Sequence, residues 1–82
     1  MLNNLVRFYG FTVSGAYLFR GFGSINNGMT VRVYDLGDNV KIVTERFYYN
    51  GEEDYSNTQT QVVPLYALWQ SLPAEALQLQ KR

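Results

Sequence analysis

The fold is decided by the stretch from Met29 to Glu45, MTVRVYDLGDNVKIVTE. Apolar and polar residues alternate on both sides of Gly37-Asp38, which is the pattern of two half-buried strands joined by a tight turn. A two-residue loop at that dipeptide fixes the pairing of the two strands. It sets Tyr34 opposite Lys41, Arg32 opposite Val43 and Thr30 opposite Glu45, on the face away from Val31, Val33, Val40 and Ile42.

Upstream of this hairpin, the alternating pattern continues with glycine and asparagine clusters about every ten residues, which favours an antiparallel meander. The runs 6–13 and 16–22 flank Ser14-Gly15, a plausible hairpin turn. The first nine residues fit two structures, because Leu2, Leu5, Val6 and Tyr9 also have helical spacing. We favour a strand there and keep a short helix as the alternative.

Downstream, Asn50-Gly51 predicts a second hairpin turn. The following segment, Tyr55 to Val63, contains SNTQTQ and is polar on both faces. It therefore predicts an edge strand or a partly open loop, whose unpaired backbone is able to receive a partner.

From Pro64 the apolar period changes to that of a helix, with Leu65, Leu68, Trp69 and Leu72 at i, i+3, i+4 and i+7. These side chains are expected to pack on the apolar face of the sheet. Pro73 ends or kinks this helix, and AEALQLQKR begins a second helical segment. The predicted fold class is α+β: one domain, residues 1–82, with an antiparallel sheet of four to five strands packed against one or two short C-terminal helices.

The amino-acid composition excludes several classes of function. The 82 residues, 9.5 kDa, include no cysteine and no histidine, which excludes disulfides, thiolate or imidazole metal sites, and Cys or His nucleophiles. We expect no enzyme activity, no catalytic residue, no metal and no cofactor. Gly21-Phe22-Gly23 is an isolated GxG without a nucleotide-binding context. The acidic run Glu52, Glu53 and Asp54 is expected to face solvent, with a hard-cation site as the alternative.

Charge is uneven although the net charge is zero. Residues 1–34 carry +3, residues 35–54 carry −4 and residues 55–82 carry +1. This indicates either charges that pair across the sheet or two opposed interaction faces. No apolar run is long enough to span a membrane and no signal peptide is evident, so we expect a cytoplasmic protein.

Seven tyrosines point to protein binding, because Tyr and Arg are enriched at the anchors of protein interfaces. Tyr34 and Glu45 are expected on one exposed face, roughly 13 Å apart with Arg32 between them. The competing interpretation is a diagonal Arg32–Glu45 salt bridge. Two other functions stay open: a single-stranded nucleic-acid module that uses Arg7, Arg20 and Phe19, and a phage structural or assembly subunit that self-associates through SNTQTQ.

The pattern N27-x-M29-x-V31-x-V33-Y34-x-x-G37-x-x-V40-K41-x-x-x-E45 resembles the central hairpin of small phage-encoded type I-F anti-CRISPR proteins. The resemblance covers about residues 24–50. A weaker similarity extends to the helix of Trp69, which is followed by Leu72-Pro73. It implies a small antiparallel sheet on two helices. It also implies a non-enzymatic inhibitor that docks on the repeated backbone subunits of the CRISPR RNA-guided surveillance complex and obstructs hybridisation of target DNA with the guide.

The resemblance also implies interface residues. A tyrosine and a glutamate of that interface fall on Tyr34 and Glu45, while a second tyrosine falls at Arg20, with Tyr17 the nearest tyrosine. The expected partner-binding residues are Tyr34, Glu45, Tyr17, Arg20, Arg32 and Lys41. The expected partner is a protein in the host-cell cytoplasm, with no direct nucleic-acid or membrane contact, bound by a monomer or weak homodimer.

Overall fold

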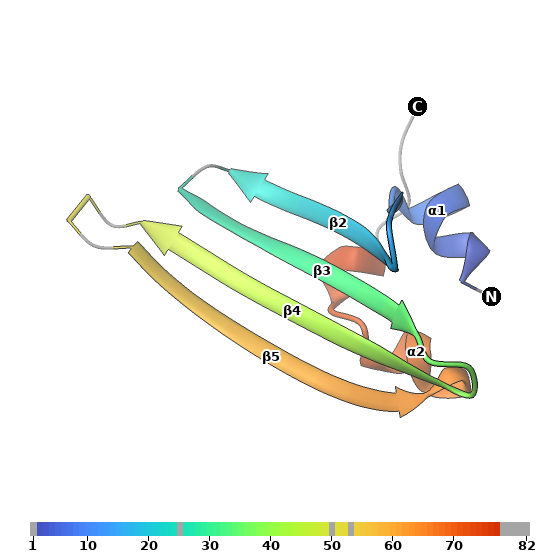
Figure 1. Ribbon diagram of the computed structural model, residues 1–82. Helices are drawn as coiled ribbons and strands as arrows, with labels where there is room; N and C mark the ends of the chain where they lie inside the picture. The colour runs from blue at the N-terminus through green and yellow to red at the C-terminus, as the bar shows by residue number, and fades with distance from the viewer. Residues whose placement is uncertain (1, 25, 50, 53, 78–82) are drawn as a thin grey trace.

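The computed structural model describes residues 2–24, 26–49, 51–52 and 54–77. In chain order the elements are α1 (Asn3–Tyr9), β1 (Thr12–Ser14), β2 (Tyr17–Ser24), β3 (Asn27–Asp35), β4 (Asn39–Tyr49), β5 (Asp54–Pro64), the 3-10 turn η1 (Leu65–Ala67), α2 (Leu68–Ser71) and the 3-10 turn η2 (Ala74–Leu77). The strands form one antiparallel sheet in the order β1-β2-β3-β4-β5 (Figure 1). The α+β class and the meander are therefore confirmed.

The hairpin of β3 and β4 has the predicted register. Tyr34 pairs with Lys41, Arg32 with Val43 and Thr30 with Glu45. The Leu36 amide closes the turn by donating to the Asn39 carbonyl at 2.9 Å. A one-residue slip would exchange the two faces of the strands, so this register determines which side chains face the core.

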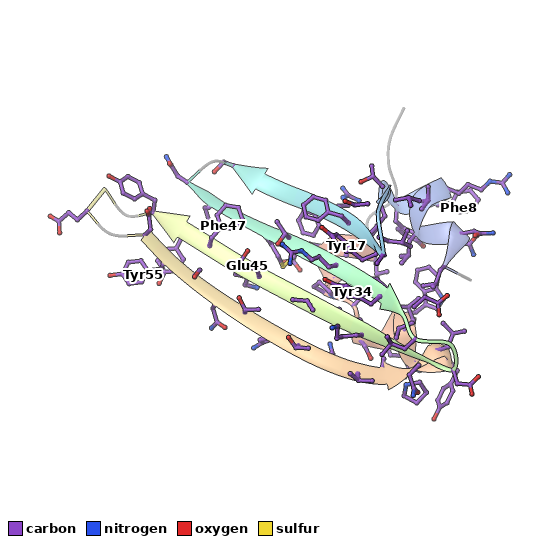
Figure 2. The ribbon with its side chains drawn as sticks, viewed as in Figure 1. Phe8, Tyr17, Tyr34, Glu45, Phe47 and Tyr55 are labelled. Atoms are coloured by element: carbon purple, nitrogen blue, oxygen red, sulfur yellow. The ribbon has the colours of Figure 1, made fainter. Side chains whose placement is uncertain are left out.

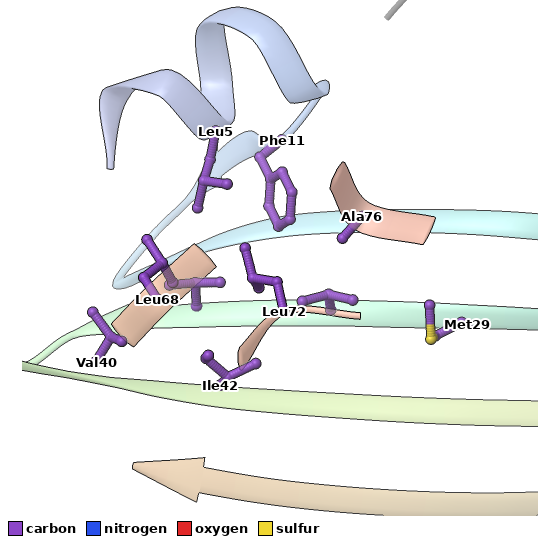
Figure 3. Packing of buried hydrophobic residues seen from close by; sticks show 10 residues of the cluster. Leu5, Phe11, Met29, Val40, Ile42, Leu68, Leu72 and Ala76 are labelled. Atoms are coloured by element: carbon purple, nitrogen blue, oxygen red, sulfur yellow. The ribbon is translucent and has the colours of Figure 1, made fainter. Parts of the chain in front are cut away.

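One face of the sheet carries the hydrophobic core (Figure 3). The buried side chains come from α1, the following loop, β3, β4 and the C-terminal segments: Leu5, Phe11, Met29, Val31, Val33, Val40, Ile42, Leu68, Leu72 and Ala76. Figure 1 shows α2 and the C-terminal turn behind the sheet, and α1 beside the beginning of β2. The helical segments thus cover a single face.

The preference for an N-terminal strand is wrong, because residues 3–9 form α1. Leu5 is fully buried and anchors the helix. Gly10 adopts the left-handed conformation at φ 77°, where glycine is the usual residue that ends a helix. The helix shortens the first strand to Thr12–Ser14, and Ser14 pairs with Tyr17, so the turn falls one residue later than predicted.

The C-terminal helix is broken into short pieces. Pro64 ends β5, and the Leu65 amide donates to the Asp38 carbonyl at 2.9 Å, which fastens η1 to the turn of the central hairpin. Leu68 and Leu72 are buried as predicted. Trp69 is half-buried and its ring lies 5.4 Å from that of Tyr9. The predicted second segment begins as η2, and residues 78–82 lie outside the described residues.

Strands β4 and β5 pair along their whole length, from Asn39 opposite Pro64 to Tyr49 opposite Asp54. The predicted edge strand is confirmed, while Asn50 and Glu53 of the predicted turn and acidic run lie outside the described residues. Within the described residues there is no group of three acidic side chains placed to hold a metal ion. No described helix has the length and apolar character needed to cross a membrane.

Candidate protein-binding face

No described element covers the face of the sheet opposite the core. The open face, as the term is used here, consists of the outward side chains of β2, β3 and residues 41–47 of β4: Tyr17, Phe19, Thr30, Arg32, Tyr34, Lys41, Val43, Glu45 and Phe47. Because side chains alternate along a strand, each of these lies on the side away from the buried residues. In the described part of the chain no helix crosses this face, and Figure 2 shows Tyr17, Tyr34, Glu45 and Phe47 along it.

Two tyrosines and two cations form a row across the open face. Tyr17 and Tyr34 are direct cross-strand partners, with ring centroids 5.1 Å apart. The Lys41 ammonium lies 4.4 Å from the centroid of Tyr34, and the Arg32 guanidinium lies 5.6 Å from that of Tyr17. Each cation–π contact at a partly exposed site contributes about 0.5–1 kcal/mol. The row therefore orders four long side chains in advance, which lowers the entropic cost of docking them on a partner.

Arg32 and Glu45 form no ion pair, so the diagonal salt bridge is wrong. The Arg32 guanidinium turns toward Tyr17 instead, and its buried Nε has no hydrogen-bond partner. Glu45 lies between Thr30 and Thr58 on the neighbouring strands, both of which are neutral. The open face thus carries a half-buried carboxylate that forms no ion pair with a cation of the described residues.

One ion pair is formed between described residues, and it lies on the core side of the sheet. Arg46 on β4 contacts Glu75 of η2, with Nη2 and Oε2 3.1 Å apart. A hydrogen bond from the Glu75 backbone and the Arg46 guanidinium together hold the pKa of Glu75 below its ordinary value of 4.5. This pair joins the sheet to a C-terminal turn. Among the described residues no ion pair joins two strands, so charge pairing across the sheet does not account for the uneven charge distribution.

The two phenylalanines of the open face each lie next to a glycine. The Phe19 ring lies near Gly21, where an added Cβ would be 3.6 Å from the ring. The Phe47 ring lies closer to Gly28, and a Cβ there would be 2.7 Å from it. Sequence reasoning placed Val43 on this face, opposite Arg32, but it did not place Phe19 or Phe47 there. The alternation that placed Tyr34 and Glu45 there applies equally to them.

Arg20 is the one expected partner-binding residue that the structure separates from the rest. It pairs with Val31 and so lies on the core side of β2. Its guanidinium donates to the Tyr9 carbonyl and lies 5.1 Å from the ring centroid of Phe22. Strand alternation alone opposes a shared face, since Arg20 is an odd number of residues from Tyr17. Its observed contacts fasten α1 to the sheet.

Not all tyrosines belong to the open face. Tyr48 and Tyr55 lie at the far end of the β4–β5 hairpin, on the core side, and their rings stack with centroids 4.8 Å apart. Tyr66 on η1 is 79% exposed. The tyrosines thus form separate groups, and only Tyr17 and Tyr34 contribute to the cation-aromatic row.

Comparisons of this chain with protein-family models, curated proteins and solved structures find no match. The geometry itself defines the class: a small α+β domain with a five-stranded meander, one face closed by a core and one face open. The open face carries tyrosine, phenylalanine and arginine side chains, and aromatic residues and arginine are enriched at the anchors of protein interfaces.

Proposed function

We propose that this chain is a non-enzymatic protein-binding inhibitor, an anti-CRISPR protein whose open face docks on the CRISPR RNA-guided surveillance complex and blocks target DNA binding. The partner surface is formed by the backbone subunits of that complex. The resemblance of the central hairpin supplies the partner, and the open face supplies the binding surface.

The observation that carries the proposal is the gathering of five of the six expected contact residues on one uncovered face. These are Tyr17, Arg32, Tyr34, Lys41 and Glu45. The aromatic pair with its flanking cations serves as the anchor, and Glu45 meets a basic side chain of the partner. A buried, hydrogen-bonded charge pair of this kind contributes specificity as well as affinity.

Tyr17 takes the place of the tyrosine that the resemblance sets at Arg20. Its ring touches that of Tyr34 with a tilt of 44°, so one contact patch includes both. Arg20 is committed to the Tyr9 carbonyl on the core side. We therefore assign the binding role to Tyr17, Arg32, Tyr34, Lys41 and Glu45, and give Arg20 a positioning role for α1.

The proposal is tested by co-elution of the purified chain with a purified type I-F surveillance complex, followed by a DNA-binding assay of the complex. Tyr34→Ala and Glu45→Ala are each expected to weaken binding by at least tenfold, because truncation of an interface anchor costs about 2 kcal/mol or more. Glu45→Gln removes the charge but keeps the size of the side chain, so comparison with Glu45→Ala separates the two effects on binding. Inhibition of DNA binding is expected to fall in parallel.

Tyr66→Ala is the matched control, because it removes a 79% exposed tyrosine that lies off the open face. It is expected to bind as the unmodified chain does. Far-ultraviolet circular dichroism and a urea midpoint establish that each variant folds. Absence of binding by the unmodified chain, or unchanged binding of both open-face variants, would overturn the proposal.

The nucleic-acid alternative has less structural support. Of the three residues on which it rests, Phe19 is on the open face, Arg20 is on the core side, and Arg7 is on α1 with its guanidinium 5.2 Å from the Phe8 ring centroid. They form no common groove. Nuclease treatment before co-elution distinguishes the two functions, because only a nucleic-acid module loses its partner.

A further inference from the structure

Strand β5 presents a long unprotected edge. It pairs with β4 along its whole length, residue for residue from Asp54 to Pro64, without a bulge. Among the described strands β4 is its only neighbour. Each residue from Asp54 to Val62 is exposed. The outward backbone groups of such a strand are a template for one more strand.

The sequence of β5 lacks the features that ordinarily prevent edge pairing. Natural edges carry lysines, inward charges, bulges or internal prolines. The only charged residue of β5 is Asp54 at its first position, and its only proline is Pro64 at its last. The nine residues between them are uncharged. The opposite side of the sheet differs, because β1 covers the beginning of β2 from Tyr17 to Phe19.

We propose that the β5 edge binds a second copy of this chain, antiparallel and with two-fold symmetry, to give a ten-stranded sheet. The register places Gln59 opposite Gln59 at the symmetry axis and uses every residue of β5. The further pairs are Thr58 with Thr60, Asn57 with Gln61, Ser56 with Val62, Tyr55 with Val63 and Asp54 with Pro64.

This register is self-complementary on both faces. Thr58 meets Thr60 on one side, and Tyr55 meets the β-branched Val63 on the other, both of which are favourable cross-strand pairs. Gln59 meets Gln59 at the axis, whereas the Gln61 side chain donates to the Ser71 carbonyl at 3.0 Å within its own chain. The single acid faces a proline, so no like charges oppose each other. Because each pair joins residues of equal parity, the two cores lie on one side of the sheet and the two open faces on the other.

Exposed aromatic side chains near the ends of the paired β5 strands add a second contribution to the stability of the proposed dimer. Tyr48 stacks on Tyr55 and is 51% exposed on the core side. In the proposed dimer, this stacked pair lies beside Val63 of the second copy, and symmetry repeats the contact at the other end. Burial of apolar area there stabilises the pairing beyond its backbone hydrogen bonds.

Sedimentation equilibrium of the full chain, in a concentration series to about 1 mM, tests the proposal. The mass is expected to rise from 9.5 kDa to twice that value. Gln59→Lys and Gln59→Glu each place like charges in contact at the axis. Each is expected to weaken the dimer by about fivefold, whereas an equal mixture of the two is expected to restore it.

Asn3→Lys and Asn3→Glu are matched controls, since Asn3 is exposed on α1, which lies beside β2 with β3 and β4 between it and β5 (Figure 1). A mass of 9.5 kDa throughout the series would overturn the proposal, as would Gln59 variants that dimerise as tightly as the unmodified chain or fail to restore each other. Gln59 pairs with Thr44 on the core side. Failure of the dimer therefore leaves the proposed docking of the open face intact, and loss of docking leaves the dimer intact.

Discussion

At the scale of single residues, Gly28 shows how closely the open face is packed. A Cβ at this position would lie 2.7 Å from the Phe47 ring and 2.9 Å from the Phe22 carbonyl oxygen. Gly28→Ala is therefore expected to lower the free energy of unfolding by about 1–3 kcal/mol. In a Phe47→Ala background, where the contact with the ring is absent and that with the Phe22 carbonyl remains, Gly28→Ala is expected to cost less. Urea denaturation measures both.

Gly21→Ala is the matched control for that experiment. Gly21 is also on the open face, yet an added Cβ meets nothing closer than 3.6 Å, an ordinary contact. Replacing glycine within a strand reduces the entropy of the unfolded chain and stabilises by up to about 1 kcal/mol. A stability loss as large at Gly21 as at Gly28 would contradict the close-contact explanation.

At the scale of elements, Arg20 links α1 to the sheet through the Tyr9 carbonyl. Arg20→Ala is expected to loosen the docking of α1 while leaving the pairing of β3 and β4 unchanged. In hydrogen exchange, amides of residues 5–10 are expected to lose protection and those of the central hairpin to keep it, because local opening involves only the contacts that are broken.

Arg7→Ala provides the comparison, since Arg7 is on the same helix but exposed, against Phe8. It is expected to leave the exchange of α1 unchanged. Equal loss of protection in both arginine variants, or a loss that spreads to β3, would show that the Arg20 contact has no special part in holding the helix.

The central hairpin was predictable from the sequence because alternation and a two-residue turn specify the same register. The same reasoning placed Tyr34, Glu45, Arg32 and Lys41 on one face. It failed at α1, whose seven residues contain both helical spacing and β-prone aromatic residues, and where burial of Leu5 and the left-handed Gly10 decide the structure. Arg20 was expected at the interface because the resemblance aligns it with an interface tyrosine, whereas strand parity sets it on the core side with Val31.

At the scale of the whole molecule, the sheet separates the hydrophobic core from the face proposed to bind a partner. The core face packs under α1, α2 and η2, whereas the open face is covered by no described element. Ile42 and Val43 are consecutive residues of β4 that point to opposite faces. They therefore compare the two faces within one strand, with similar backbone surroundings and similar β-branched side chains.

Ile42 is fully buried, so Ile42→Ala is expected to lower the free energy of unfolding by about 2–5 kcal/mol. Val43 is half-buried at the centre of the open face, between Arg32 and Thr60, and Val43→Ala is expected to cost about 1 kcal/mol or less. Binding to the proposed partner, the surveillance complex, is expected to respond in the opposite order, since Val43 lies at the centre of the face proposed to dock. Urea denaturation and the co-elution assay measure the two effects on the same proteins. Equal destabilisation by both substitutions would mean that the open face is part of the folding core, and the separation of stability from binding would then be wrong.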